Sequence, residues 1–152
     1  MKAINAIWFV ALASCASAKQ GDTLADSVRQ YNDGVRWERF AVAAVHVPPK
    51  ERSTFVDEAD ERAHDLKITD YEVLKIDPKS DREASVQIKV SWYRESEGLL
   101  RETQALQSWE KHGKTWWMVD EQHVKGQEMP GLQEALTKTE PGVPPAAEAT
   151  EQ

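Results

Sequence analysis

The sequence predicts an α+β domain in which two N-terminal helices pack on a curved, four-stranded antiparallel meander sheet. Apolar residues between Leu24 and Leu66 recur at three- and four-residue intervals, which is typical of amphipathic helices. From Ile68 onward apolar and polar residues alternate, which is typical of strands with one buried face. The predicted strands are joined by short turns, and short connections favour antiparallel neighbours.

The first helix is predicted to begin at Thr23, because Thr23 and Asp26 resemble a capping box. Gly34 interrupts its apolar face and marks either a kink or a weak point within one helix. The helix ends before Pro48-Pro49, since proline cannot continue it. Its predicted buried face comprises Leu24, Val28, Tyr31 and Val35, followed by Trp37, Phe40, Ala41, Ala44 and Val45.

The second helix is predicted from Pro49, which suits a first helical turn. On one side of this helix lie Phe55, Ala59, either Arg62 or Ala63, and Leu66. Its other side is acidic and is interpreted as a solvated face, with Asp57, Glu58, Asp60 and Glu61.

Four strands follow in the predicted order. Residues 68–76 form the first strand, whose apolar pattern slips in phase and indicates a bulge. Residues 84–93 alternate most regularly and form the second. Residues 99–111 form a long third strand, and a tight turn at His112-Gly113 leads into a fourth at 115–120.

The N-terminus has the pattern of an export signal. Lys2 precedes an apolar run of about ten residues, which is too short to span a bilayer as a helix of roughly 20 residues. Residues 12–15, Leu-Ala-Ser-Cys, resemble the lipobox of bacterial lipoproteins, which implies that Cys15 is lipidated, for example with palmitate, and becomes the mature N-terminus. Alternatively, residues 16–18 are an ordinary cleavage site and Cys15 is removed with the signal peptide.

These patterns divide the chain into five segments. Residues 1–14 are predicted to be a lipoprotein signal peptide and residues 15–21 an anchor linker. Residues 22–124 form the cone-like domain. Residues 125–136 form a short C-terminal extension with one or two helical turns, and residues 137–152 a disordered tail rich in Pro, Ala, Glu and Thr.

Charge and cysteine content exclude several functions. The formal net charge of −7, without any run of basic residues, argues against nucleic-acid binding. It also means that attachment to an anionic membrane has to come from lipid, not from charge. A single cysteine excludes an internal disulfide and a CxxC site, and the four histidines show no metal-ligand spacing, so we expect no metal and no cofactor.

The order of helix, helix and four antiparallel strands, with Trp116-Trp117 on the last strand and Trp92-Tyr93 on the second, resembles the cystatin-like cone of the nuclear transport factor 2-like superfamily, which includes SnoaL-like cyclases. The resemblance covers about residues 24–122. It implies a sheet curved over helices, but no catalytic motif of that superfamily matches residue by residue. Function therefore does not transfer with it.

Aromatic residues supply the candidate binding surface, which comprises Tyr71, Trp92, Trp109, Trp116 and Trp117. The same side chains would also suit a core. Neighbouring residues on a strand point to opposite faces, so Trp116 and Trp117 cannot both pack on the same helices.

The leading functional hypothesis is a non-enzymatic, lipid-anchored module of the cell envelope that binds a protein partner or an apolar ligand. In its resemblance to the lipoproteins of two-membrane bacteria, Ala16 directly after the cysteine implies sorting to the outer membrane, at its periplasmic face. One alternative is a small enzyme whose cone pocket uses a buried carboxylate such as Asp70, with Tyr71. Another is an accessory subunit of an envelope assembly.

Overall fold

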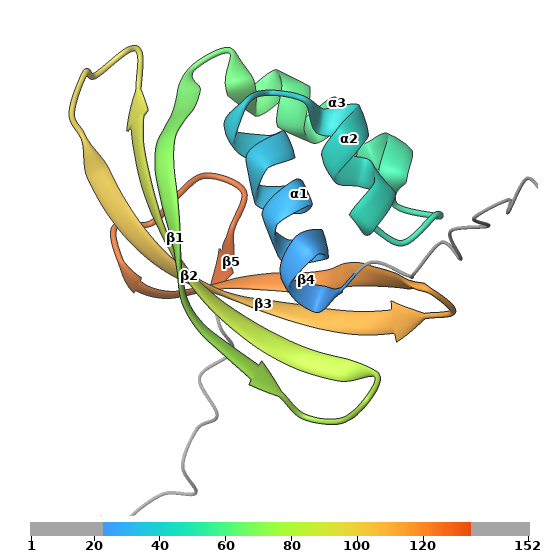
Figure 1. Ribbon diagram of the computed structural model, residues 1–152. Helices are drawn as coiled ribbons and strands as arrows, with labels where there is room; N and C mark the ends of the chain where they lie inside the picture. Colours follow the sequence, from blue (N-terminus) through green and yellow to red (C-terminus); the bar gives the residue numbers. More distant parts are fainter. Residues whose placement is uncertain (1–22, 135–152) are drawn as a thin grey trace, which may run out of the picture.

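A computed structural model describes residues 23–134, which form three α-helices on one side of an antiparallel sheet (Figure 1). The predicted signal peptide, Cys15 and the C-terminal tail lie outside the described residues. Among residues 23–134, no helix combines the length and apolar character needed to cross a membrane.

The helical layer consists of α1 (Leu24–Arg36), α2 (Phe40–Ala43), a 3₁₀ turn η1 (Ala44–His46) and α3 (Arg52–Ala63). The predicted cap of α1 is confirmed: the Thr23 hydroxyl accepts a hydrogen bond from the backbone N–H of Asp26 at 3.1 Å. The prediction of two N-terminal helices is roughly consistent with this layer, but the first predicted helix is divided, because α1 ends at Arg36. Glu38 then adopts a left-handed backbone conformation (φ 55°) that turns the chain into α2.

Gly34 explains how α2 fits against α1. A Cβ atom at Gly34 would lie 2.9 Å from both the Cβ and the backbone N of Ala43. The glycine therefore allows α2 to cross α1 in direct contact, and it neither kinks nor ends α1.

Four long strands form the meander: β1 (Leu66–Pro78), β2 (Glu83–Arg94), β3 (Arg101–His112) and β4 (Thr115–Gly126). The phase slip predicted in the first strand is confirmed by register shifts at Ile68/Asp70 and Val73/Lys75. β4 continues well past the predicted end at residue 120. A short β5 (Gln133–Glu134) pairs parallel with β4, where helical turns were predicted.

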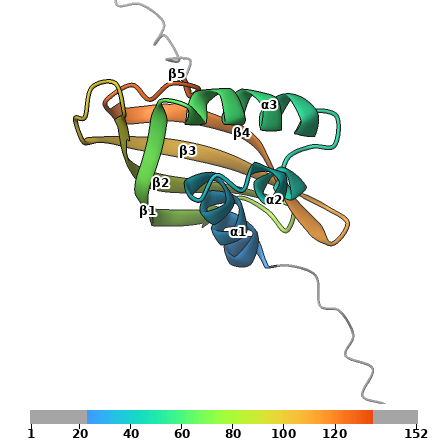
Figure 2. The same ribbon diagram turned by 90° about the horizontal axis from the view of Figure 1, so that it is seen from above.

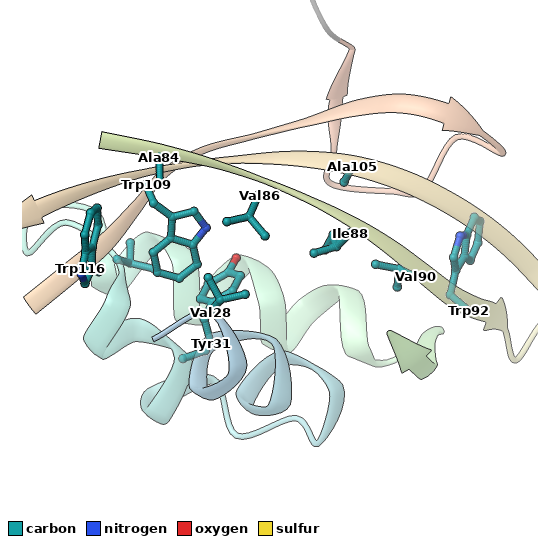
Figure 3. Packing of buried hydrophobic residues seen from close by; sticks show 12 residues of the cluster. Val28, Tyr31, Ala84, Val86, Ile88, Val90, Trp92, Ala105, Trp109 and Trp116 are labelled. Carbon is teal, nitrogen blue, oxygen red and sulfur yellow. The ribbon is translucent and has the colours of Figure 1, made fainter. Parts of the chain in front are cut away.

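All three helices lie on the same face of the sheet, and α3 runs alongside β4 (Figure 2). The alternation predicted for the second strand is confirmed, because every second residue from Ala84 to Trp92 is buried. Tyr31 lies beneath Trp109 in this core, with the two ring centroids 5.9 Å apart at an angle of 89° (Figure 3).

Candidate functional site

The candidate site is a pocket of about 340 Å³ between α3 and β4. Its walls combine apolar side chains with charged groups. The residues around it are Tyr31, Val47, Lys50, Glu51, Thr54, Phe55, Glu58, Arg62, Met118, Val119, Asp120, Glu121 and Gly131.

Gln107 connects this pocket to the protein interior. Its side chain is fully buried on β3, and its amide nitrogen donates to Glu121 Oε1 at 2.7 Å and to Asn32 Oδ1 at 3.0 Å. Its amide oxygen accepts from the indole N–H of Trp109 at 3.2 Å. The amide therefore uses both donor hydrogens and its acceptor within the network, as a buried polar group requires.

Glu121 presents its carboxyl group at the pocket. Loss of hydration raises the pKa of Glu121 above its ordinary value, and the neighbouring charge of Asp120 raises it further. The hydrogen bond from Gln107 and the positive charge of Arg62 lower the pKa; each is a smaller effect than the loss of hydration and a larger one than the charge of Asp120. The carboxyl group is thus held in one place by Gln107 and takes up a proton more readily than an exposed glutamate.

Tyr31 forms the aromatic floor beside Glu121. Only 3% of its surface is exposed, and it contacts Phe55 with ring centroids 5.9 Å apart. Burial, and then the charge of Glu121, raise the pKa of Tyr31 well above its ordinary value. The phenol therefore stays protonated and can both donate and accept a hydrogen bond.

Arg62 stands at the mouth of the pocket. Its guanidinium pairs with Glu58, one helical turn earlier on α3, at 3.7 Å. The backbone of Gly131 lies directly against it, since a Cβ there would come within 2.7 Å of Arg62 Nε. The segment that leads from β4 to β5 therefore fixes the position of Arg62.

Three of the predicted aromatic residues, Trp92, Trp109 and Trp116, lie in the core and not on an open surface. Trp92 lies at the opposite end of the core from Trp109 and Trp116 (Figure 3). Trp92 also donates its indole N–H to the buried Thr103 hydroxyl at 2.8 Å. All three tryptophans pack within the core, so the structure does not bring them together as a binding groove.

Trp117 lies on the outer face of the sheet. It pairs with Glu110 across the ladder and stacks on His112, with ring centroids 4.0 Å apart and planes 13° apart. Of the predicted aromatic surface, Trp117 and Tyr71 are the members that are only partly buried, and they lie on β4 and β1, which β2 and β3 separate.

Asp70 is not the buried carboxylate that the enzyme alternative needs. Its side chain is 67% exposed and pairs with Arg36 at 3.0 Å, because the bulge at Thr69 places it beside the end of α1. Tyr71 instead donates its hydroxyl to Asp33 at 2.9 Å. The two neighbours thus join β1 to α1, away from the pocket between α3 and β4.

Sequence reasoning missed both Gln107 and Glu121. Gln107 had a usable signal, because it is a polar residue on the apolar face that Thr103, Ala105 and Trp109 define. Glu121 had none. Alternation from Trp116 predicts an outward Glu121, but a register shift pairs Met118 with Trp109 and Asp120 with Ser108, which leaves Val119 as a bulge and turns Glu121 inward opposite Gln107.

Within residues 23–134, no three His, Cys, Asp or Glu side chains gather as a metal site. The buried His46 has structural partners. One ring nitrogen lies 3.1 Å from the backbone oxygen of Trp116, and the other lies 3.2 Å from the Gln30 amide oxygen.

No family model and no curated protein sequence matches the chain. Solved structures do match its fold. A SEC-C motif containing protein from Rhodopseudomonas palustris is 14% identical at a TM-score of 0.57, over 66% of this chain and 77% of that chain. A ketosteroid isomerase-like protein from Erwinia carotovora atroseptica is 10% identical at a TM-score of 0.56, over 68% of this chain and 94% of that chain. The second likeness supports the nuclear transport factor 2-like fold that the order of elements predicts.

Proposed function

We propose that this protein is a lipid-anchored module of the cell envelope that binds a small molecule in the pocket between α3 and β4. The observation that carries the proposal is that Glu121, held by Gln107, and Tyr31 line the same pocket together with the apolar side chains of Phe55 and Met118. Small-molecule sites combine apolar walls with a few fixed polar groups, and their volumes range from about 300 to 1,000 Å³. A volume of about 340 Å³ suits a ligand at the small end of this range.

Preorganisation supports a binding role for Glu121. Gln107 holds the carboxyl group from behind, and Asn32 and Trp109 hold Gln107 in turn. A ligand that meets a fixed partner loses less conformational entropy in the complex than one that has to order a mobile side chain.

The ligand-binding proposal is tested on full-length protein extracted gently from membranes. Native mass spectrometry should show an additional small mass on the wild-type protein and none on Glu121→Gln. Glu102→Gln removes the same charge from an exposed position on β3 and should keep the additional mass. Equal occupancy of the wild type and Glu121→Gln would contradict a role for this pocket.

The anchor is tested separately, because it depends on Cys15 alone. Two or more acyl chains hold a protein stably at a bilayer, whereas one holds it only marginally. We expect labelled palmitate on the wild-type protein and its recovery in the outer-membrane fraction. Palmitate incorporation by Cys15→Ser, with continued membrane recovery, would end the lipoprotein proposal.

A second candidate function is proton-transfer catalysis in the same pocket, because the pKa of Glu121 is raised toward the range that suits a general acid or base. This candidate replaces the Asp70 carboxylate with Glu121. If it holds, Glu121→Gln protein should retain an unchanged ligand that the wild-type protein releases as a converted product. Recovery of the same compound from both proteins would exclude it.

A further inference from the structure

We infer that the pocket takes a small organic cation, a primary or quaternary ammonium with an apolar body, whose charge pairs with Glu121. The inference rests on the proposed function and gives the ligand its chemical class. Three features of the pocket carry it: the charge at the floor, the aromatic walls and the charges at the rim.

The first feature is a carboxylate that forms no ion pair within residues 23–134. Its one hydrogen bond comes from the neutral amide of Gln107. The positive charge of Arg62 acts on Glu121, but the guanidinium pairs with Glu58 at 3.7 Å. A poorly hydrated carboxylate without a cation is unfavourable, and an ammonium in the pocket would remove that cost.

The second feature is the aromatic wall. Tyr31 and Phe55 both line the pocket, and their ring centroids lie 5.9 Å apart. Aromatic faces attract ammonium groups through the ring quadrupole, whereas they give an anion no such attraction. The hydroxyl of Tyr31, which makes no hydrogen bond within residues 23–134, can accept one from a primary ammonium.

The third feature is the charge of the rim. The carboxylates there are Glu51, Glu58 and Asp120, and the cations are Lys50 and Arg62. With Glu121 ionised, the pocket contains four carboxylates and two cations. This balance attracts a cationic ligand and repels an anionic one. The apolar side chains of Val47, Met118 and Val119 would contact the ligand's uncharged part.

The test compares three probes of one size that differ in charge: benzylammonium, benzyl alcohol and benzoate. Binding to the full-length protein is measured by isothermal titration and by the ¹³C shift of the Glu121 carboxyl carbon. We expect benzylammonium to bind at least tenfold more tightly than benzyl alcohol and benzoate not to bind. The amine should lower the pH midpoint at which the Glu121 carbon titrates, because an ammonium partner favours the ionised carboxylate.

Two variants test whether Glu121 and Phe55 cause the preference for the amine. Glu121→Gln should abolish the preference for the amine while it leaves weak binding of benzyl alcohol. Phe55→Leu should lower the affinity for benzylammonium more than the affinity for benzyl alcohol, because it removes a ring face and keeps an apolar wall. Glu102→Gln, on the exposed side of β3, should bind all three probes as the wild type does.

The outcomes separate the inference from the proposed function. If benzyl alcohol or benzoate binds at Glu121 as tightly as the amine, the pocket is a binding site but not one for cations. If the amine's advantage survives in Glu121→Gln, the inference is also overturned. If none of the three probes binds, both the inference and the small-molecule proposal fail.

Discussion

Gln107 donates a hydrogen bond to Glu121 Oε1 at 2.7 Å, and this contact joins the hydrogen-bond network of the core to the open pocket. The same amide group donates to Asn32 on α1. A single side chain of β3 thereby couples the position of the first helix to the position of the pocket carboxylate.

Replacement of Gln107 by leucine is expected to destabilise the fold by about 1–3 kcal/mol, because Asn32 and the indole N–H of Trp109 lose their partner in the interior. It should also raise the pKa of Glu121 further, since the hydrogen bond from Gln107 lowers it. Urea denaturation and the ¹³C titration of Glu121 measure the two effects.

Gln104→Leu provides the matched control for this prediction. Gln104 lies on the same strand but faces outward, where it accepts a hydrogen bond from Gln87. Its replacement should change stability by no more than about 0.5 kcal/mol. Equal stability losses in the two variants would mean that the buried hydrogen bonds of Gln107 contribute no more to stability than the hydrogen bond of Gln104 on the outer face.

Glu121 gives the folding equilibrium a defined pH dependence. Its pKa in the folded protein is raised above the ordinary value of 4.5, so the folded state binds its proton more tightly than the unfolded state does. The resulting stabilisation is fully present below about pH 4.5 and is lost as the pH rises through the raised value in the folded protein. Wild-type stability should therefore fall relative to Glu121→Gln as the pH rises from 4.5.

Urea denaturation of both proteins between pH 4 and pH 8 checks this sign. The comparison of variants matters because the lowered pKa values of Asp65 and Asp77 act in the opposite direction and are common to both proteins. A rise in wild-type stability relative to Glu121→Gln with increasing pH would contradict the raised pKa that loss of hydration gives Glu121.

The sequence predicts most of the sheet because its second strand has one uniform apolar face from Ala84 to Trp92. It misses the extension of β4 because residues 121–126 are largely polar, and their strand is maintained by backbone pairing with β3. It also misses the break between α1 and α2, since glutamate does not favour the left-handed backbone that Glu38 adopts.

The candidate site was not predictable from the sequence to the same degree. The periodicity of two places one of Trp116 and Trp117 in the core and the other outside, and the structure has Trp116 inside. The same periodicity fails for Glu121, because a bulge at Val119 shifts the phase of all residues after it. The position of a bulge depends on how two strands pair, and the pattern of apolar residues along one strand carries no information about that pairing.

Tyr71 is expected to ionise with a pKa of about 12, because partial burial and the hydrogen bond to Asp33 both disfavour the phenolate. The stability that this contact contributes is fully present below pH 10 and is lost as the pH rises through about 12. Titration of the ring ¹³Cζ resonance measures this value.

The Asp33→Asn substitution separates the effect of the negative charge of Asp33 from that of its hydrogen bond with Tyr71. An asparagine can still accept the hydrogen bond of Tyr71 but has no negative charge. The pKa of Tyr71 should then decrease toward 10 without reaching it, since partial burial remains the largest cause of its shift. A Tyr71 pKa unchanged by this substitution would show that the negative charge of Asp33 has no influence on it.

The two adjacent tryptophans should differ in their contribution to stability. Trp116→Ala removes a large side chain that is 7% exposed, which costs about 3–5 kcal/mol in a core. Trp117→Ala loses the stacking with His112 on the outer face, a contact worth about 0.5–1.5 kcal/mol. Chemical denaturation of both variants measures the difference, and equal losses would contradict the assignment of Trp116 to the core.

The close contact between α1 and α2 at Gly34 leads to a prediction about Gly34→Ala, whose effect a second substitution should partly reverse. Gly34→Ala would ordinarily stabilise a helix by about 1 kcal/mol, because alanine has the higher helix propensity. Here the added Cβ would lie 2.9 Å from the backbone N and the Cβ of Ala43, so the two helices have to separate. Overpacking of this kind costs about 1–3 kcal/mol, and we expect a net loss of stability in thermal and urea denaturation.

Ala43→Gly tests whether the loss arises from this contact. In the double variant one of the two close contacts disappears, because Ala43 no longer has a Cβ, while the approach to its backbone N remains. Partial recovery relative to the sum of the single effects is therefore expected, with a coupling energy of about 0.5–3 kcal/mol. Strictly additive effects would place the cost of Gly34→Ala elsewhere, and the close crossing of α1 and α2 would then not be the reason for glycine at this position.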